Sequence, residues 1–573
     1  MAGPLVHALL ELDSSGWGPL AFGAPRTFIE ARATADVVPA LRAAEAAARD
    51  GSWVVGFVAY EAAPAFDPAL RVRAGAGPLA WFGVHDGPLE APPPGPDDAR
   101  ITGLEPELDA TTHAAAVTAI RDAVAAGAVY QVNFTFRLRG RLEGDPIALF
   151  RRLRGAQGSG DAAYVRTGAR AIVSASPELF LARRGDGVTS RPMKGTARRG
   201  RWPEEDDAAR LRLAASEKDR AENVMIADLL RNDLGRVAMT GSVRAGPLLE
   251  VERLRSVWQL TSTISARLLP GADLADLLGA TFPCGSVTGA PKIAAMRFIA
   301  ALERSPRGAY CGAVGALAPG GDACFNVGIR TAEVDLGTGA AVYGTGGGIT
   351  WDSDPAAEWD EALAKTRVLE MDPGLPTLLE TMRLEGGRVA LLDGHLARLS
   401  GSARYHGIPL QLETVRARIS AQAGDARLRL LVSPDGGVAV ERAALPPRGV
   451  EPVPVAFSAD PVDRRDPALF HKTTRRAPYE RRRAERPDAF ETLLVNREGE
   501  VTEGTFTNLV ADLDGERVTP PLDAGLLPGV FRAGLLARGE VRERRLRVGD
   551  LARANRLWIV NALRGWIEAR LVP

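Results

Sequence analysis

The lysine in the stretch SRPMKGTARRGRW, residues 190–202, is the first candidate for chemistry in this chain. Lys194 follows an apolar residue and precedes Gly195 and Thr196, where we expect the chain to turn tightly. A neutral lysine amine is a nucleophile, and burial or a nearby cation keeps it neutral by lowering its pKa. The alternative is an ordinary solvated surface charge.

Two pairs of carboxylates, far apart in the sequence, could hold a metal ion. Asp219 and Glu222 lie three residues apart, and so do Glu358 and Glu361, so each pair shares one face of a predicted helix. A single pair is more often a solvated acidic surface. Together, four carboxylates from two helices could hold Mg²⁺ and leave positions open for a substrate carboxylate.

The two predicted helices have recognisable ends and faces. Asp354 fits the N-cap of the second helix, and Pro355 fits its first turn. In the first helix an apolar stripe is expected to face inward, formed by Val224, Met225, Leu229 and Leu230.

Glycine-rich backbone and one arginine suggest that the same region binds an anion. In YGTGGGIT, Gly346 and Gly347 allow backbone amides to approach a ligand closely, although the stretch matches no phosphate-binding fingerprint. GSVTGAPKIAAM predicts a turn that leads into a helix at Pro291. Arg330 lies in an apolar stretch predicted as a strand, where a guanidinium requires a partner such as a carboxylate.

The C-terminal part carries a second set of reactive groups. Lys472 follows a short apolar segment, and Glu503 lies in a predicted strand. The stretch GLLPGVFRAGLLA predicts a glycine turn followed by a helix. A lysine, an acid and an anion-binding helix end are what pyridoxal phosphate requires. Arg398 is expected near the start of an amphipathic helix, and the three arginines at 481–483 are expected on a solvated face.

Composition indicates a globular protein that works on small molecules. The chain has 573 residues, enough for several cores at ~150 residues per domain. Lys plus Arg total 71 and Asp plus Glu total 71, so no overall charge favours nucleic acid or an anionic membrane. With no signal-like or membrane-spanning stretch and three scattered cysteines, we expect a cytoplasmic protein with buried thiols.

Proline and glycine divide the chain. A proline-rich run at 87–97 predicts a surface loop after a β-rich lobe over 1–100, and MDPGLPT at 371–377 predicts the main boundary. We therefore expect one domain over 1–370 and another over 376–573, both of mixed α/β (α+β) class. LLETMRLEGGRVALL predicts a hairpin at the start of the second domain.

Six motifs over about residues 110–370 occur in the order found in the chorismate-utilising enzymes. They are SPELF, PMKGTARRG, DRAENVMIADLLRNDLGRV, FPCGSVTGAPKIAAM, FNVGIRTAE and GTGGGITWDSDPAAEWDEALAK. The resemblance implies an α/β fold of two packed antiparallel sheets with Mg²⁺ and chorismate between them. It implies the following site residues: Glu222 and Glu361 as metal ligands supported by Asp219 and Glu358, Arg330 and Tyr310 on the enolpyruvyl carboxylate, Thr288 with Gly346 and Gly347 seating the substrate, and Glu178 as general acid.

Within that family the residue at position 194 distinguishes the products. Anthranilate synthases carry Pro-Ile-Ala-Gly-Thr and aminodeoxychorismate synthases carry Pro-Ile-Lys-Gly-Thr, whereas this chain has PMKGT. The resemblance implies that Lys194 attacks C2 of the ring as the C4 hydroxyl leaves, and that ammonia then adds at C4. Gln131 stands where isochorismate and salicylate synthases have a lysine, which disfavours water activation, and Gln259 replaces a histidine found in several relatives.

Residues 376–570 resemble the fold type IV pyridoxal phosphate enzymes, which include branched-chain aminotransferases and aminodeoxychorismate lyase. The resemblance implies that Lys472 is the Schiff-base lysine and that Glu503 pairs with the pyridine nitrogen. It assigns the cofactor phosphate to Arg398, Val530, Phe531, Asn561 and Ala562. A cofactor-free module is the alternative.

Together the two resemblances imply a bifunctional enzyme that makes 4-aminobenzoate, the folate precursor, from chorismate. No cysteine lies in a glutaminase nucleophile elbow, so a separate glutamine amidotransferase subunit is the expected partner, and a homodimer through the second domain is also expected. The alternatives are an anthranilate synthase fused to an aminotransferase, and a non-catalytic chorismate- or cofactor-binding regulatory module. LLELDSSG resembles the segment where relatives bind tryptophan.

Overall fold

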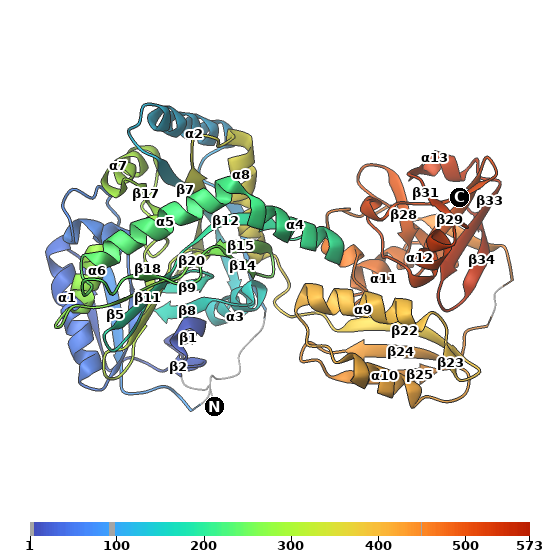
Figure 1. Ribbon diagram of the computed structural model, residues 1–573, viewed down its shortest axis with the longest axis horizontal. Helices are drawn as coiled ribbons and strands as arrows, with labels where there is room; N and C mark the ends of the chain where they lie inside the picture. Colours follow the sequence, from blue (N-terminus) through green and yellow to red (C-terminus); the bar gives the residue numbers. More distant parts are fainter. Residues whose placement is uncertain (1–4, 91–97, 448–449) are drawn as a thin grey trace. The chain divides into compact units, whose positions relative to one another are not determined.

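The computed structural model describes residues 5–90, 98–447 and 450–573, and the chain divides into two compact units (Figure 1). The first unit contains Met1–Arg198 and Arg210–Gly374, and the second contains Arg199–Ala209 and Leu375–Pro573. The chain enters the second unit briefly at Arg199–Ala209, returns to the first, and passes finally into the second inside the MDPGLPT segment. Residues 91–97 of the predicted proline-rich loop lie outside the described residues.

Two large antiparallel sheets form the framework of the first unit. The first sheet has nine strands in the order β17-β7-β21-β20-β9-β8-β1-β2, with β6 beside β7. Its strands are β1 (Ala8–Leu12), β2 (Leu20–Phe22), β6 (Ala99–Pro106), β7 (Gln131–Gly144), β8 (Asp161–Arg166), β9 (Arg170–Ser176), β17 (Gly289–Ala290), β20 (Thr331–Asp335) and β21 (Ala340–Ile349).

The second sheet also has nine strands, in the order β13-β16-β11-β10-β19-β18-β4-β5-β3. They are β3 (Thr27–Ala31), β4 (Trp53–Val58), β5 (Ala80–His85), β10 (Leu179–Arg184), β11 (Gly187–Arg191), β13 (Arg244–Ala245), β16 (Ile264–Arg267), β18 (Ala313–Leu317) and β19 (Ala323–Val327). A small three-stranded sheet, β12-β15-β14, contains β12 (Met193–Arg198), β14 (Glu250–Arg253) and β15 (Val257–Thr261).

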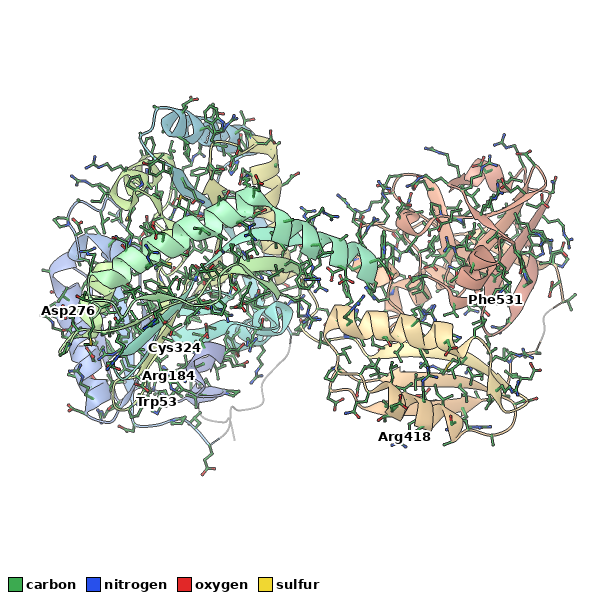
Figure 2. All side chains as sticks on the ribbon, viewed as in Figure 1. Trp53, Arg184, Asp276, Cys324, Arg418 and Phe531 are labelled. Atoms are coloured by element: carbon green, nitrogen blue, oxygen red, sulfur yellow. The ribbon has the colours of Figure 1, made fainter. Side chains whose placement is uncertain are left out.

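The two large sheets pack face to face through apolar side chains that both contribute. Leu10 and Ala163 from the first sheet and Val55, Val314 and Cys324 from the second belong to one buried cluster, and Trp53 packs against it; Trp53 and Cys324 are labelled in Figure 2. Alternate residues of a strand point to opposite faces, so each sheet can supply a continuous apolar surface to the other. The predicted pair of packed antiparallel sheets is confirmed.

Helices cover the outer faces of these sheets. They are α1 (Thr34–Arg49), α2 (Ala110–Ala125), α3 (Pro146–Gln157), α5 (Glu217–Gly235), α6 (Leu274–Thr281), α7 (Lys292–Leu302) and α8 (Pro355–Ala364), while α4 (Pro203–Ala215) begins in the second unit and ends in the first. The predicted start of α8 is confirmed, because the Asp354 side chain accepts a bond from the amide of Ala357 and Pro355 follows it.

The inward stripe predicted for α5 is wrong at one position. Leu230 is fully buried, but Val224 is 45% exposed. At 3.6 residues per turn, positions six apart project about 120° from each other around a helix, so both cannot face the core.

A four-stranded sheet and two helices form one part of the second unit. The sheet order is β23-β22-β24-β25, with β22 (Leu378–Glu385), β23 (Arg388–Val389), β24 (Ala426–Val432) and β25 (Val438–Ala443), and the helices are α9 (Leu392–His406) and α10 (Leu412–Ser420). The predicted hairpin is confirmed, since Glu385 of β22 pairs with Arg388 of β23. Leu396 and Leu399 of α9 and Ile419 of α10 share a buried core with the strands.

The other part of the second unit is a nine-stranded mixed sheet, in the order β31-β30-β29-β33-β34-β26-β27-β28-β32. Its elements are β26 (Val453–Phe457), β27 (Glu491–Val495), β28 (Glu500–Gly504), β29 (Asn508–Leu513), β30 (Glu516–Thr519), β31 (Arg542–Glu543), β32 (Leu546–Arg547), β33 (Arg556–Asn561), β34 (Gly565–Leu571) and the helices α11 (Ala477–Ala484), α12 (Val530–Ala537) and α13 (Val548–Leu551). Strand β26 runs parallel to both of its neighbours, β27 and β34.

The basic helix α11 is not a uniformly solvated face. Arg481 and Arg483 are exposed, but Arg482 is only 9% exposed, so the expectation for the triple arginine is wrong at that position. Its guanidinium donates to the backbone oxygens of Asp460 and Pro478, which allows it to be buried.

All three cysteines are buried thiols, as predicted. Among the described residues, no helix is both long and apolar enough to cross a bilayer.

We predict that Gly315→Ala destabilises the first unit by about 2 kcal/mol or more. A methyl group on Gly315 of β18 would lie 2.0 Å from the carbonyl oxygen of Cys324 on β19, and neither backbone can move without breaking the sheet. The midpoint of urea unfolding measures the effect. Gly87→Ala is the control, because its methyl would meet no other atom within 4 Å; equal midpoints for the two variants would contradict the prediction.

Candidate active sites

Lys194 lies on an irregular strand rather than in the tight turn expected for it. It is the second residue of β12, and the pairing of β12 with β15 shifts register between Met193 and Thr196. Gly195 takes up the irregularity with a φ of +86°, a conformation that other residues rarely adopt. The side chain of Asn223 on α5 donates to the carbonyl oxygens of Lys194 and Leu260, at 3.1 and 3.0 Å, and so fixes this part of the strand.

The amine of Lys194 lies in a narrow space beside Gly348 and Gln131. A methyl group on Gly348 would come within 2.8 Å of the lysine Nζ and 2.2 Å of the Gln131 Nε2, so only glycine leaves room for both side chains. Burial lowers the pKa of Lys194. The negative charge of Glu222 acts to raise this pKa, and the positive charge of Lys365 lowers it further. Within the described residues Lys194 forms no ion pair, so its amine is free to react.

Glu178 provides a buried acid close to this amine. It lies between β9 and β10, and its Oε1 has no hydrogen-bond partner among the described residues. Burial raises the pKa of Glu178 to about 7, although Ser286 and Lys194 act in the opposite direction. A substantial fraction of this carboxyl is therefore protonated near neutral pH and can donate a proton.

The four predicted metal ligands come from α5 and α8, as the sequence suggested, and they influence one another electrostatically. Burial raises the pKa of Glu222, and Asp219 and Glu358 add to this effect. Lys365 forms an ion pair with Glu361 at 2.9 Å, which lowers the pKa of Glu361. These are hard oxygen donors of the kind Mg²⁺ prefers.

One of these carboxylates, Glu361, is already paired with Lys365. Among the described residues no three His, Cys, Asp or Glu side chains lie together as a metal site requires. Lys365 also donates to the carbonyl oxygen of Gly346 at 2.8 Å, and Ser353 donates to Glu358 at 2.7 Å. The donor chemistry fits Mg²⁺, and Lys365 now fills the role of a neutralising cation for Glu361.

Arg330 is a guanidinium without an acidic partner in the described part of the chain. It precedes β20 with a φ of +49°, and its Nη1 donates to the side-chain oxygen of Gln157. Burial lowers the pKa of Arg330, and among the described residues no carboxylate forms an ion pair with it. The buried Tyr343, whose hydroxyl has no described partner, also acts on it electrostatically. This arrangement suits an incoming carboxylate.

Two of the predicted substrate residues contact other groups of the protein. The ring of Tyr310 packs against Gly344, and the guanidinium of Arg137 lies 4.8 Å from the ring centroid. Thr288 is fully buried, and its hydroxyl donates to the carbonyl oxygens of Cys284 and Gly285. Among the described residues no hydrogen bond joins Tyr310 or Thr288 to Arg330, and the substrate roles expected for them stay predictions.

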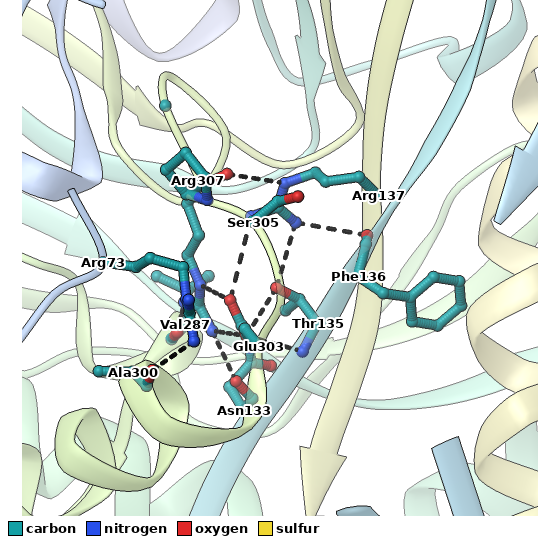
Figure 3. Close-up of polar contacts among 12 residues, drawn as sticks. Arg73, Asn133, Thr135, Phe136, Arg137, Val287, Ala300, Glu303, Ser305 and Arg307 are labelled. Carbon is teal, nitrogen blue, oxygen red and sulfur yellow. Dashed lines mark hydrogen bonds and ion pairs between the residues drawn. The ribbon is translucent and has the colours of Figure 1, made fainter. Parts of the chain in front are cut away.

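A buried ion pair fixes the backbone behind these residues (Figure 3). Glu303 and Arg307 are 2.6 Å apart, and Glu303 also accepts bonds from the amide and hydroxyl of Thr135. Arg307 donates to the carbonyl oxygens of Val287 and Asn133. The pair thus joins β7 to the turn before Thr288. Because β7 pairs with residues 346–348 of β21, it also positions the glycine segment.

Some of the polar residues around Lys194 and Arg330 have no recognisable pattern in the sequence. Gln131 was noted only as a replacement, yet it is buried and neither its amide oxygen nor its nitrogen has a described partner. Gln157 and Tyr343 gave no signal, because only folding brings them to Arg330. Lys365 could have been found from its spacing, four residues after Glu361 on the same helix face.

The second unit contains a cavity of about 330 Å³ that gathers most of the second set of predicted residues. Its lining includes Lys472, Glu503, Arg398, Val530, Asn561 and Ala562. Phe531 does not line it; its ring, labelled in Figure 2, lies 6.3 Å from the ring of Trp566. Arg398 lies in the middle of α9 rather than near its start.

Lys472 and Glu503 are both desolvated inside this cavity. Burial lowers the pKa of Lys472 to about 8, with help from Arg398 and Arg476. Burial also raises the pKa of Glu503 to about 8. Hydrogen bonds from the backbone of Leu527 and the side chain of Tyr479, and the charge of Arg476, act to lower this pKa. Tyr479 and Asn508 donate to the two oxygens of Glu503 at 3.2 and 3.3 Å and hold the carboxyl in place.

Arg398 is held by a buried acid and retains hydrogens for a ligand. It donates to both oxygens of Glu380, at 2.9 and 2.6 Å, and to the carbonyl oxygen of Pro528. His395 contacts the same carboxylate at 2.7 Å. Five N–H groups are available on a guanidinium, so Arg398 can still bind an anion in the cavity.

The cavity also fits the phosphate of pyridoxal phosphate. Helix α12 begins after Gly529 without a side-chain cap, so its first amides can bind an anion. A methyl group on Gly529 would lie 1.8 Å from the Asn508 side-chain oxygen, so the close approach requires glycine. The Asn561 side chain accepts from the amides of Leu563 and Arg564 and shapes the turn that contains Ala562.

Comparisons with known proteins agree with this division into two units. Residues 20–371 match the family model of chorismate binding enzymes over more than half of the chain, and the protein belongs to that family. Residues 377–572 match the model of class IV amino-transferases, so a chorismate-binding domain is followed by a fold type IV aminotransferase-like domain.

Individual relatives resemble the first unit. Aminodeoxychorismate synthase component 1 of Klebsiella aerogenes is 44% identical over 239 residues, 42% of this chain and 52% of that protein. Anthranilate synthase component 1 of Streptomyces coelicolor is 40% identical over 275 residues, 48% of this chain and 53% of that protein. The crystal structure of anthranilate synthase component I from Streptococcus pneumoniae has a TM-score of 0.52 and 26% identity, covering 65% of this chain and 91% of that one. The chain spans about half the length of the Klebsiella aerogenes and Streptomyces coelicolor proteins that it matches.

We predict that Glu380→Gln destabilises the second unit by about 3 kcal/mol at pH 7, because Arg398 would stay buried without its acid. Burial acts to raise the pKa of Glu380, but Arg398 and His395 outweigh this effect and lower that pKa from 4.5 to about 2. The stability from this lowered pKa is present above about pH 4.5 and is lost as the pH falls towards 2. Urea unfolding should therefore show a smaller difference between wild type and variant at pH 4 than at pH 7.

Glu441→Gln is the control for this experiment, because Glu441 forms an exposed ion pair with Arg429 that is worth ~0.5 kcal/mol. An equal loss in the two variants would refute the special role of the buried pair.

Proposed function

We propose that this protein makes 4-aminobenzoate from chorismate in two steps. The first unit would replace the C4 hydroxyl of chorismate by an amino group, and the second would eliminate pyruvate from the resulting 4-amino-4-deoxychorismate. The observation that carries the proposal is Lys194, a desolvated amine without an ion pair, in the family position that separates para from ortho amination. The product of one unit is then the substrate of the other.

In the first unit the neutral amine of Lys194 would bond to C2 of the ring as the C4 hydroxyl leaves. Glu178 would protonate that hydroxyl, so that it departs as water. Ammonia would add at C4 and expel Lys194 from C2, which restores the free amine. Arg330 would bind a carboxylate of chorismate, since it has no described acidic partner.

Magnesium fits the proposal through Glu222, Glu361, Asp219 and Glu358, which would hold the ion while it neutralises a substrate carboxylate. Gly346 and Gly347 would allow the ring to lie close to the backbone. Tyr310 would bind the enolpyruvyl carboxylate together with Arg330, and Thr288 would help to seat the substrate.

In the second unit pyridoxal phosphate would supply an electron sink for the bond cleavage. Lys472 would hold the cofactor and then remove the proton at C4 of the substrate, which its low pKa of about 8 favours. Glu503 would face the pyridine nitrogen. Arg398, Asn561, Ala562 and the first amides of α12 at Val530 and Phe531 would bind the phosphate.

Ammonia would come from a glutamine amidotransferase subunit. Similar proteins are named component 1, which implies a partner component. Glutamine-dependent turnover would then require the added subunit, whereas ammonia-dependent turnover would not. A homodimer through the second unit and a cytoplasmic location also remain predictions.

An anthranilate synthase fused to an aminotransferase is the competing function. The relative named anthranilate synthase component 1, 40% identical, favours it. Lys194 opposes it, because anthranilate synthases have alanine at that position. The position of the amino group in the aromatic product, para or ortho, separates the two.

We predict that purified wild-type protein, given chorismate, ammonia, Mg²⁺ and pyridoxal phosphate, forms 4-aminobenzoate and pyruvate. Lys194→Ala should lose at least about 100-fold of this activity, whereas Lys472→Ala should accumulate 4-amino-4-deoxychorismate. Chromatography with mass detection identifies the products.

Arg198→Ala is the matched control, since Arg198 is exposed on the same strand as Lys194. Unchanged 4-aminobenzoate formation by Lys194→Ala would rule out the proposed first step.

We predict that amination in the first unit slows as the pH rises through about 7. Glu178 must donate a proton, and its pKa of about 7 means that the protonated form disappears above that pH. The kcat at saturating ammonia and chorismate should therefore have a descending limb near pH 7, and Glu178→Gln should be inactive across the range. A kcat that rises steadily to pH 9 in the wild type would contradict this role.

A further inference from the structure

Three arginines line the cavity of the second unit, and none of their side chains is among the groups assigned to the cofactor. Arg427 comes from β24, Arg483 from α11 and Arg564 from the turn between β33 and β34, and all three line the cavity. The guanidinium carbon of Arg483 lies 4.8 Å from the ring centroid of Phe506, and that of Arg564 lies 5.9 Å from the same centroid. Three distant segments thus bring like charges to one place.

None of these arginines is neutralised by an acid in the described part of the chain. No ion pair involves them there, and the Nε of Arg427 is buried without a hydrogen-bond partner. Burial lowers the pKa of Arg564, and the charges of Arg427 and Arg483 add to that effect. Like charges held together at the wall of a cavity are costly unless an anion joins them.

Glu491, an acid that acts electrostatically on Arg564, is already hydrogen-bonded to other groups. Glu491 is fully buried, and it accepts bonds from the hydroxyls of Thr505 and Thr507 at 2.6 and 2.8 Å and from the amide of Phe506 at 3.0 Å. These bonds fix the loop that carries Phe506. The ring is therefore a rigid support for two guanidinium groups, which is the arrangement of a preformed site.

We propose that Arg427, Arg483 and Arg564 form a carboxylate site that selects a dicarboxylate amine as the substrate of the second unit. The proposal rests on the function proposed above and names the residues that would recognise the substrate's far end. Lys472 lies in the same cavity and would face the amino group.

The chemistry of the proposed substrate matches three guanidinium groups. The ring carboxylate of 4-amino-4-deoxychorismate is para to the amino group, and the enolpyruvyl group carries a second carboxylate. With the amine at Lys472, both carboxylates would point to the rest of the cavity. Bidentate arginine–carboxylate pairs are among the strongest hydrogen-bonded contacts in proteins, and one arginine can serve each carboxylate while the third bridges them.

We test the site in the full-length protein loaded with pyridoxal phosphate. Arg564→Gln and Arg483→Gln should each raise the KM for 4-amino-4-deoxychorismate by about tenfold or more, the usual effect of losing a charge-assisted contact. The kcat and the visible absorbance of the bound cofactor should change little, because neither residue is assigned to the cofactor. Arg481→Gln is the matched control: it is an exposed arginine of the same helix as Arg483, paired with Asp460.

A binding measurement separates this site from the proposed function. By titration calorimetry the wild type should bind benzene-1,3-dicarboxylate at least about tenfold more tightly than benzoate, and Arg564→Gln should lose this preference while Arg481→Gln keeps it. Arginine-dependent binding without turnover would support the carboxylate site and refute the lyase function. Turnover, with a KM unchanged in the arginine variants and no preference for the dicarboxylate, would refute the site and support the lyase function. If Arg564→Gln does not fold, the exposed Arg483→Gln gives the same two tests.

Discussion

Desolvation of a lysine amine is the constraint on which both units depend. Lys194 and Lys472 are each half-buried without an ion pair among the described residues, and in each case burial is the main cause of the lowered pKa. A charged amine would lose its hydration there, so the surrounding protein favours the neutral, nucleophilic form. Everything that holds these side chains away from water therefore contributes to their reactivity.

Buried ion pairs supply the rigidity that this arrangement requires. Glu303 and Arg307 join β7 to the turn before Thr288, and Glu380 holds Arg398 at the wall of the second cavity. Such pairs gain little net stability, because desolvation offsets their attraction, but losing one member leaves the other charged and unpaired. Their contribution is to fix one arrangement of strands and helices around each lysine.

The two units use different frameworks to reach similar ends. In the first, Gly348 makes room for the Lys194 amine on a long antiparallel strand; in the second, Gly529 opens α12 beside Asn508. Both glycines lie where a methyl group would collide with a functional side chain. Each unit also contains groups of the kind that bind anions, Arg330 in one and the uncapped first turn of α12 in the other, which would suit ligands that carry carboxylate or phosphate.

The sequence by itself determined the two families, the pairs of carboxylates on α5 and α8, the cap at Asp354 and the two lysines, because local spacing and ordered motifs carry that information. Only the tertiary structure decided which side chains meet. It pairs Lys365 with Glu361, brings Gln157 to Arg330, and turns Val224 outward on α5. These contacts join residues that are distant in sequence, or depend on the angle at which a helix meets its sheet, and no local pattern records either.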